Sequence, residues 1–461
     1  MHDGLRRELA ALDLHDKRLT RRVMQVLTKM SERPAGTIPT IFPLAREAKA
    51  AYRLLGTQLH SVDAEGNSQQ IGLGEALLAA CVDACVARIR DQEQLVLAIQ
   101  DTTEISFDSS PVGEAGGLWV HTTFACTAEG VPLGLLDQRC WQREADRPGR
   151  EARRERPLED KESYRWIEAL RAVHERVPQE STVLTVADRE ADIYELFAEP
   201  RPHNSELLIR ACRDRRTSDE YKYLLASVEA APVAAEGTLT LQRRPDRGAR
   251  VARLRLRYKP VTLLPPTHGL HEPLPPLNLW AILVEEPAAP EGEKPVCWLL
   301  LTTLPITETA QAYECLQHYT CRWLIERFHY VLKSGCRVED SQLRTLERLR
   351  AFLGLCCVVA WRLLWITYSA REAGDQPATV VFLDIEWQAA YCALHQGQAP
   401  PKETPTLREA VRWVAQLGGF LARTGDGDPG VKVLWRGMKR LHDIVLGALL
   451  FAPHLLDVGN A

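Results

Sequence analysis

Residues 319–333 carry the clearest alternation of polar and apolar positions in the chain. Their sequence, YTCRWLIERFHYVLK, places Tyr319, Arg322, Glu326 and Lys333 at offsets 0, 3, 7 and 14. At about 100° per residue, these four positions lie within roughly 60° of one another on a helix. Leucine, isoleucine, phenylalanine and valine occupy the opposite side. The pattern predicts an amphipathic helix with one buried face and one face that carries a phenol, two cations and a carboxylate.

Two interpretations of this polar face are open on the pattern alone. Arg322 and Glu326 could form an (i, i+4) ion pair on a solvated helix face, which is the common role of such charges. Alternatively, the carboxylate could bind a divalent cation while the neighbouring cations bind phosphate groups. Other segments of the sequence are needed to distinguish a surface ion pair from a metal-binding and phosphate-binding face.

Two short apolar runs upstream predict buried strands of an α/β sheet. Residues 95–99 read LVLAI and residues 182–187 read TVLTVA, and each run is followed closely by an aspartate, Asp101 or Asp188. In an α/β sheet, ligands bind at the carboxyl ends of the strands. If the two runs form neighbouring parallel strands, Asp101 and Asp188 lie close enough to share a metal ion. One such aspartate alone would be explained by a turn, which favours this residue as well.

The remaining pattern predicts three regions, as expected for 461 residues. Residues 1–75 are expected to be helical, residues 76–372 to form an α/β core, and residues 373–461 to form a helical C-terminal region suited to dimerisation. Within the core, residues 213–297 alternate as strands around a proline-rich stretch, which predicts a β-rich insertion. The other elements predicted are a hairpin over 118–127 and 131–137, strands over 207–210 and 296–302, and helices over 162–177, 191–197, 347–369, 384–394 and 407–417.

The charge is distributed unevenly. The net charge of −4 is not typical of a nucleic-acid-binding protein, but residues 1–57 hold 11 Lys and Arg against 6 Asp and Glu. A local positive field attracts DNA more effectively than the charge of the whole chain suggests. The candidate DNA-binding residues on the two predicted helices of this segment are Lys17, Arg18, Arg21, Arg22, Lys49 and Arg53. A solvated helical surface explains the same charges equally well.

Two further classes of protein are disfavoured by the composition. The 12 cysteines show no paired spacing typical of a zinc site, and we expect them to be reduced thiols, as in a cytoplasmic protein. No uninterrupted apolar stretch has the length of a membrane-spanning helix, and no leader-like segment begins the sequence, so no membrane association is expected.

The three carboxylates Asp101, Asp188 and Glu326 would suit metal-dependent phosphoryl transfer. Such a set can hold two Mg²⁺ ions about 4 Å apart, one that activates water or a 3′-hydroxyl and one that stabilises the leaving oxygen. Mg²⁺ prefers oxygen ligands, so histidine and cysteine are not required, and Mn²⁺ is expected to substitute for it. The side chains expected to hold the DNA backbone beside the ions are Tyr319, Arg322 and Lys333.

The spacing Tyr319-x2-Arg322-x3-Glu326-x6-Lys333 is similar to the YREK signature of the insertion-sequence-four family of DDE transposases, and the chain resembles the transposon-five type of that family. Other segments carry the likeness over nearly the full length. In chain order they are DKRLTRR, AYRLL, IQDTT, KESYRW, VADREADIYE, CWLLLTT, SGCRVED and LGGF-x4-GDGDPG.

The resemblance implies an RNase H-like catalytic core interrupted by a β-rich insertion, with a helical DNA-binding region before it and a helical dimerisation region after it. It implies cut-and-paste transposition, in which one strand is nicked at the transposon end, its 3′-OH forms a hairpin, the hairpin is opened, and the end is joined to target DNA. The family's catalytic and metal-binding triad corresponds to Asp101, Asp188 and Glu326. Its backbone-binding residues correspond to Tyr319, Arg322 and Lys333.

Three further residues are candidates for the surroundings of this site. Trp298 occupies the position at which the family keeps a tryptophan that stacks on a flipped base, although the strand pattern alone would place it in the core. Arg210, at a strand end, could reach the active-site DNA backbone or could be a surface arginine. His329, close to Glu326, is interpreted as structural.

The resemblance also implies the partners. A homodimer would bind the terminal inverted repeats of its element and the target DNA in a synaptic complex, in the cytoplasm of a bacterium and on its nucleoid. Two other functions stay open on the sequence. One is a DNA-binding inhibitor that pairs with an active partner without cleaving, and the other is a host-adopted nuclease that cleaves without joining ends to a target.

Overall fold

A mixed β-sheet forms the centre of the core in the computed structural model, which describes residues 16–62, 68–92, 95–107, 117–143, 156–241, 249–267 and 274–451. Within these residues the sheet has nine strands in the order β5-β4-β3-β6-β7-β11-β10-β9-β8. The strands are β3 (Val96–Ile105), β4 (Leu118–Thr127), β5 (Pro132–Trp141), β6 (Val183–Ala187), β7 (Ser205–Arg210), β8 (Ala235–Leu241), β9 (Arg250–Leu263), β10 (Leu277–Glu285) and β11 (Cys297–Thr302). The pairs β3–β6 and β6–β7 are parallel, and the other neighbours are antiparallel.

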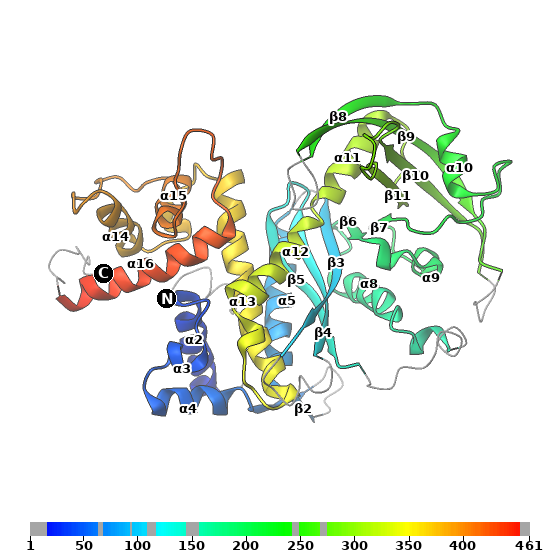
Figure 1. The fold of residues 1–461 in the computed structure, drawn as a ribbon. Coiled ribbons are helices and arrows are strands. Elements are labelled where there is room, and N and C mark those ends of the chain that lie inside the picture. The colour runs from blue at the N-terminus through cyan, green and yellow to red at the C-terminus, as the bar shows by residue number, and fades with distance from the viewer. Residues whose placement is uncertain are drawn as a thin grey trace.

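Helices cover both faces of this sheet (Figure 1). The helices α8 (Tyr164–Arg176) and α9 (Tyr194–Ala198) pack on one face, and α11 (Thr309–Thr320) and α12 (Trp323–Tyr330) pack on the other. This two-sided cover explains the sequence of β6, in which all five residues of VLTVA are buried.

The segment 213–297 contains strands, as the sequence predicts, but they continue the sheet instead of interrupting it. β11 pairs with β7 through Leu300 and Arg210, and β10 pairs with β11. A short helix, α10 (Leu224–Glu229), lies against β9 and β10. The strands of this segment therefore belong to the same hydrogen-bonded sheet as the strands of the core.

The N-terminal region is helical only in part. It contains α2 (Lys17–Glu32), α3 (Ile38–Ile41) and α4 (Ala45–Leu54), followed by the two-stranded sheet β1 (Gln58–Val62) and β2 (Ser68–Gly72) and by α5 (Leu73–Arg90). The Asp16 side chain caps α2 by accepting hydrogen bonds from the backbone of Arg18 and Leu19. The prediction of helix as far as residue 75 was wrong for 58–62 and 68–72, which are strands. Their runs QLHSV and SQQIG lack the 3–4-residue apolar repeat of a helix.

The C-terminal region consists of helices. They are α13 (Leu346–Glu372), which links it to the core, and α14 (Asp384–Leu394), α15 (Leu407–Leu417) and α16 (Val431–Phe451). By length and composition α13 could cross a membrane, but 89% of its most apolar window is buried inside the protein, as in the core helix of a globular domain. The helices α14, α15 and α16 match the prediction of a helical C-terminal region.

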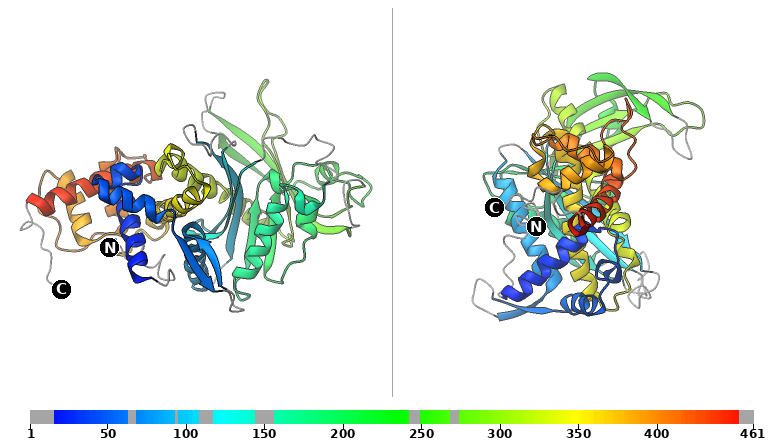
Figure 2. Two further views of the ribbon diagram at one scale, coloured as in Figure 1. Left: turned by 90° about the horizontal axis from the view of Figure 1, so that it is seen from below. Right: turned by 90° about the vertical axis from the view of Figure 1, so that its left-hand side faces the viewer.

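The first and last helical regions lie side by side (Figures 1 and 2). Arg33, directly after α2, forms an ion pair with Asp443 of α16 at 3.1 Å, and the His442 Nε2 atom lies 3.5 Å from Glu32 Oε2. Both ends of the chain thus form one helical part beside the sheet.

Candidate active site

Asp101 lies on β3, and Asp188 directly follows the neighbouring parallel strand β6. In the register of β3 and β6, Gln100 lies opposite Ala187, so the two aspartates follow at the next position along strands about 4.8 Å apart. β3 does not end at residue 99, as its apolar run suggested, because it continues to Ile105 as a partner of β4. Asp101 therefore lies within a strand, at the point where its parallel neighbour ends.

Both aspartates are on the face of the sheet that α12 covers. Side chains alternate along a strand, so Asp101 shares its face of β3 with Ile99. Asp188 still has an extended backbone and shares its face with Val186. Ile99 and Val186 belong to the same buried cluster as Phe328 of α12. The alternation thus directs both carboxylates toward the helix that carries Glu326.

Glu326 is held by an arginine of its own segment. The Arg322 Nη2 atom donates a hydrogen bond to Glu326 Oε1 over 2.6 Å, and the Arg322 side chain is only 12% exposed. Burial alone would lower the pKa of Arg322, but the neighbouring Tyr319 and Glu326 outweigh it and raise that pKa. The negative charge of Asp101 also raises the pKa of Arg322, so the charge on β3 acts on the arginine that begins α12.

The predicted single helix over 319–333 is divided in the structure. α11 ends at Thr320, α12 begins at Trp323, and residues Val331–Gly335 form a π-helical turn in which the Cys336 backbone N–H reaches Val331 O at 2.7 Å. The extra residue in this turn changes the direction in which Lys333 points relative to an uninterrupted α-helix. Its Nζ atom lies 3.9 Å from Glu339 Oε1, and this carboxylate also accepts a hydrogen bond from the Ser106 backbone.

Tyr319 is not part of an exposed polar face, because it is 6% exposed. Burial raises the pKa of its phenol, while the nearby Arg322 and Arg210 act to lower it and Asp188 acts to raise it. These electrostatic neighbours place Tyr319, Arg210 and Asp188 in one region. The apolar half of the prediction is confirmed, since the residues expected to be buried, Leu324, Ile325, Phe328, Val331 and Leu332, are all buried.

Trp298 is half-buried on β11 and packs at the edge of the main core cluster. Trp298 is two residues before Leu300 and therefore shares its face of β11, and Leu300 lies opposite Arg210 in the register of β11 and β7, so Trp298 and Arg210 are on the same face of the sheet. The Arg210 Nη2 atom donates a hydrogen bond to the Cys297 carbonyl over 3.2 Å. Both side chains thus lie on the face that carries Tyr319.

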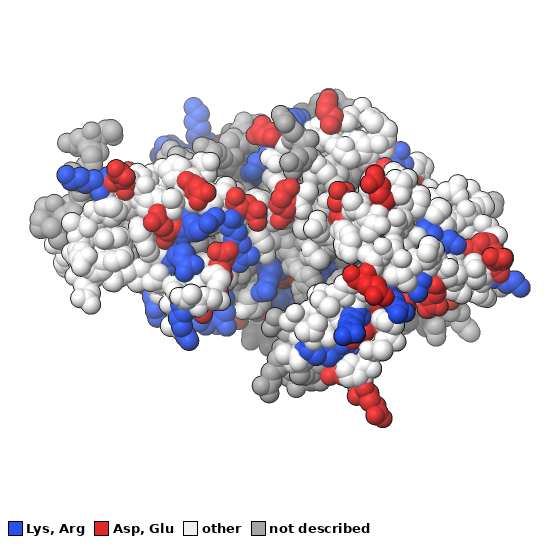
Figure 3. Space-filling view, turned by 90° about the horizontal axis from the view of Figure 1, so that it is seen from above, with Lys and Arg blue, Asp and Glu red and all other residues white. Residues whose placement is uncertain are grey.

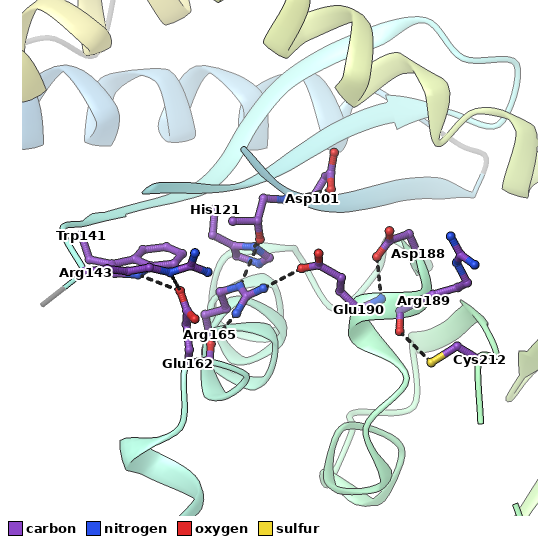
Figure 4. A network of polar contacts seen from close by, with 11 residues as sticks. Asp101, His121, Trp141, Arg143, Glu162, Arg165, Asp188, Arg189, Glu190 and Cys212 are labelled. Atoms are coloured by element: carbon purple, nitrogen blue, oxygen red, sulfur yellow. Dashed lines mark hydrogen bonds and ion pairs between the residues drawn. The ribbon is translucent and has the colours of Figure 1, made fainter. Parts of the chain in front are cut away.

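A second polar network, which the sequence did not predict, lies on the opposite face of the sheet (Figure 4). Its centre is Arg165 of α8, which contacts Thr102 and Glu190. Burial, together with the positive charge of Arg165, lowers the pKa of His121 well below its ordinary value. Arg165 falls within the KESYRW segment, but nothing in that segment indicates which residues it contacts.

His329, interpreted as structural, is 6% exposed, and its Nδ1 atom lies 3.6 Å from Asp101 Oδ2.

The donor set fits a hard divalent cation, because Asp101, Asp188 and Glu326 offer carboxylate oxygens. Among the residues that the structure describes, however, no three His, Cys, Asp or Glu side chains are grouped closely enough to hold a metal ion as they stand. The Arg322 contact to Glu326 is one physical reason, since it directs this carboxylate to a cation of the protein. Metal binding at this site therefore requires side-chain movement.

The basic residues of the N-terminal helices are exposed. Within the described part of the chain, no carboxylate pairs with any of Lys17, Arg18, Arg21, Arg22, Lys49 and Arg53. In contrast, Lys29 of the same helix α2 pairs with Glu47 at 3.1 Å and lies over the Phe42 ring. Seen from above, Lys and Arg also gather on the helical part formed by the two chain ends (Figure 3). Such unpaired surface cations are available to phosphate groups.

Three family models match the chain. Residues 1–58 match a family described as Transposase DNA-binding, residues 162–362 match Transposase DDE domain, and residues 358–454 match Transposase Tn5 dimerisation domain. Asp188 and Glu326 lie inside the second match, and Asp101 lies before it. The three matches follow the order of the helical, mixed α/β and helical regions described above.

Proposed function

Because this chain belongs to the DDE transposases of the Tn5 type, which cleave DNA, transfer strands, and carry DNA-binding and dimerisation domains, we propose that it moves its element by a cut-and-paste route through a hairpin. The family also accounts for the fold, since a DDE domain is RNase H-like. The observation that carries the proposal is the placement of Asp101 and Asp188 at neighbouring positions of parallel strands, facing the helix of Glu326.

DDE domains use divalent metal ions, and we propose two Mg²⁺ ions, replaceable by Mn²⁺, held by Asp101, Asp188 and Glu326. When bound, such ions activate the attacking oxygen and stabilise the leaving oxygen of a phosphodiester. Arg322 and Lys333 would hold phosphate oxygens of the DNA backbone beside the acids, and Tyr319 would donate a hydrogen bond to one of them. Arg210 and Trp298 would contact the DNA on the same face of the sheet.

The proposed sequence consists of four phosphoryl transfers. A water oxygen first bonds to the phosphorus at the element's end and the P–O3′ bond breaks, which leaves a 3′-OH. This hydroxyl then attacks the opposite strand, forming a hairpin and releasing the flanking DNA. A second water bonds to the hairpin phosphorus and breaks its P–O3′ bond, which restores the 3′-OH. This hydroxyl finally bonds to a target phosphorus, and the P–O3′ bond of the target strand breaks and leaves a 3′-OH on the target. Trp298 would provide the stacking surface for the base that is extruded when the hairpin forms.

The proposed substrates are the terminal inverted repeats of the element and a target duplex, held by a homodimer on the bacterial nucleoid. Exposed basic side chains on α2 and α4 would contact the terminal repeats. An intact set of acids and an N-terminal DNA-binding match argue against a non-cleaving inhibitor. A nuclease without strand joining would need the same acids, so the experiment below distinguishes it.

The test is incubation of the purified chain with short linear DNA ends, a target plasmid and Mg²⁺. Hairpin ends and joined products support the proposal, binding without cleavage supports the inhibitor, and cleavage without joining supports the nuclease. Asp188→Ala should abolish cleavage and leave end binding intact. If this substitution also removes binding, Asp188 has a structural role instead.

A further inference from the structure

Arg165, in the first turn of α8, joins three segments through one guanidinium group. Its Nε atom donates a hydrogen bond to Thr102 Oγ1 at 3.0 Å, Nη1 donates to the Glu162 carbonyl at 2.7 Å, and Nη2 donates to Glu190 Oε2 at 2.9 Å. The Arg165 side chain is 12% exposed. Figure 4 shows it beside the strand that carries Asp101, with a contact to Glu190 of the loop that carries Asp188.

The partners of Arg165 are directly linked to the two aspartates. Thr102 follows Asp101, and its backbone N–H donates to Asp101 Oδ1 at 2.9 Å. The Glu190 backbone N–H donates to Asp188 Oδ1 at 2.8 Å. Arg165 therefore bridges two short segments, each of which also fixes the orientation of one aspartate.

The hydrogen-bond directions in this network are determined by its chemistry. An arginine can only donate, so the Thr102 hydroxyl accepts from Arg165 and is left to donate its own hydrogen to His121 Nδ1, 2.9 Å away. His121 can accept this hydrogen because its ring is fully buried and its pKa is lowered by burial and by Arg165. Arg165 thus donates to Thr102, and Thr102 donates to His121.

We infer that Arg165 is a positioning residue for the metal site, because its planar fork fixes the segment of Asp188 against the segment of Asp101. The inference rests on the proposed metal-binding role of these acids. Two neighbouring carboxylates repel each other before cations arrive, and the loop after β6 has no continuing strand to oppose that repulsion. A rigid bidentate donor supplies the missing constraint, which a point charge such as lysine would not.

The charge of Arg165 gives a way to separate positioning from simple electrostatics. Removing a positive charge near the carboxylates strengthens their attraction for cations, so a charge effect alone predicts tighter metal binding in Arg165→Gln. Loss of positioning predicts the opposite. The binding of Mn²⁺, measured independently of turnover, therefore distinguishes the two roles.

The experiment is a calorimetric titration of Mn²⁺ into the full chain, alone and bound to end DNA whose scissile phosphate is replaced by an uncleavable linkage. Arg165→Gln should weaken Mn²⁺ binding by roughly tenfold, as the loss of a partner behind a metal ligand does. The matched control is Arg171→Gln on the same helix. The Arg171 guanidinium forms an ion pair with Glu199 over 2.6 Å and has no contact with the proposed metal-binding acids. This control should bind Mn²⁺ as the unmodified chain does.

Each result leads to a decision. Unchanged or tighter Mn²⁺ binding in Arg165→Gln would overturn the inference while leaving the metal site itself in place. Absence of Mn²⁺ binding by the unmodified chain, with and without DNA, would overturn the proposed metal site as well. Thr102→Val keeps the charge and nearly the shape of the side chain, so it tests the same network if Arg165→Gln fails to fold. A several-fold weakening is expected for it, and unchanged binding would count against the inference.

Discussion

The Arg322 Nη2 atom lies 2.6 Å from Oε1 of Glu326 in an (i, i+4) ion pair that is mostly shielded from solvent. The two readings of this pair that the sequence left open are thus compatible. The carboxylate is paired with a cation of its own segment in this structure, and the same carboxylate is the one proposed to bind metal. A divalent cation must compete with Arg322 for Glu326, and the displaced guanidinium would then be available to a DNA phosphate.

Arg322→Ala should therefore separate metal binding from strand transfer. Mn²⁺ should bind the free protein more tightly, because its competitor is gone, while strand transfer to a target plasmid should fall by at least roughly tenfold, the effect of losing one charge-assisted hydrogen bond. Arg327→Ala, which removes an exposed arginine of the same helix, is the control for metal binding. Unchanged strand transfer in Arg322→Ala would exclude the phosphate-binding role.

Trp298→Ala should slow hairpin formation more than the first nick. Loss of one stacking surface costs about 1–3 kcal/mol, and only the hairpin step requires the extruded base. Quenched-flow assays on labelled ends resolve the two steps. Trp298→Phe keeps an aromatic face and should retain most of the hairpin rate. If both steps slow equally in Trp298→Ala, the residue acts through its packing against the core.

Replacement of exposed cations on α2 should change the salt dependence of end binding. Arg18→Ala and Arg21→Ala should each reduce the slope of log Kd against log salt concentration by about one, since each removes one phosphate contact. Lys29→Ala on the same helix should leave the slope unchanged, because Lys29 is engaged with Glu47. Fluorescence anisotropy at several salt concentrations measures all three, and equal slopes throughout would place the DNA on another surface.

The stability of the protein should fall as the pH drops below about 6.5, the ordinary pKa of histidine. Burial lowers the pKa of His121 in the folded chain, so on acidification the unfolded state takes up a proton that the folded state does not. The contribution of this group is at most about 1.4 kcal/mol per pH unit between its unfolded and folded pKa values. Burial also lowers the pKa of His174 and His318, which act in the same direction.

His121→Gln should reduce this pH dependence, because glutamine keeps an acceptor for Thr102 but cannot be protonated. The free energy of unfolding, measured by urea denaturation at pH 7 and pH 5, should change less than in the unmodified chain. An identical change would mean that His121 is not buried in a neutral state.

Two glycines of α16 should respond in opposite ways to alanine. A Cβ atom at Gly437 would lie 1.8 Å from the Val414 carbonyl oxygen of α15, whereas a Cβ at Gly447 would meet nothing within 4 Å. Gly437→Ala should force the helices apart and destabilise the C-terminal module by roughly 1–3 kcal/mol or more. Gly447→Ala should add about 0.5–1 kcal/mol of stability, because it raises helix propensity. Chemical denaturation and sedimentation of the dimer would measure both effects.

Local pattern was sufficient to predict many elements. Helices were expected over 384–394 and 407–417, and α14 and α15 have these bounds. Both begin with an acidic first turn, and α15 also has a strong apolar periodicity. The parallel pairing of the two strands that lead to Asp101 and Asp188 was also expected, because a helix lies between two buried apolar runs.

The features that the sequence did not predict depend on contacts between distant residues. Arg165 meets Thr102 across 63 positions of chain, and no periodicity indicates which arginine of a helix turns toward a strand end. The burial of Tyr319 likewise follows from the packing of α11 on the sheet. The helical pattern alone predicted that this residue lies on an exposed face. The π-helical turn at Val331–Gly335 shifts Lys333 by a single hydrogen-bond register. The spacing of polar and apolar residues does not indicate so small a change.

The pairing of β7 with β11 has a mechanical consequence. The proposed base-stacking residue, Trp298, belongs to a strand that is hydrogen-bonded to the strand of Arg210, which is in turn paired with the strand leading to Asp188. Within the described residues these strands are joined edge to edge by hydrogen bonds, so we expect the proposed metal site and the proposed stacking surface to keep a fixed separation. Rearrangement during the reaction would then fall mainly on the bound DNA.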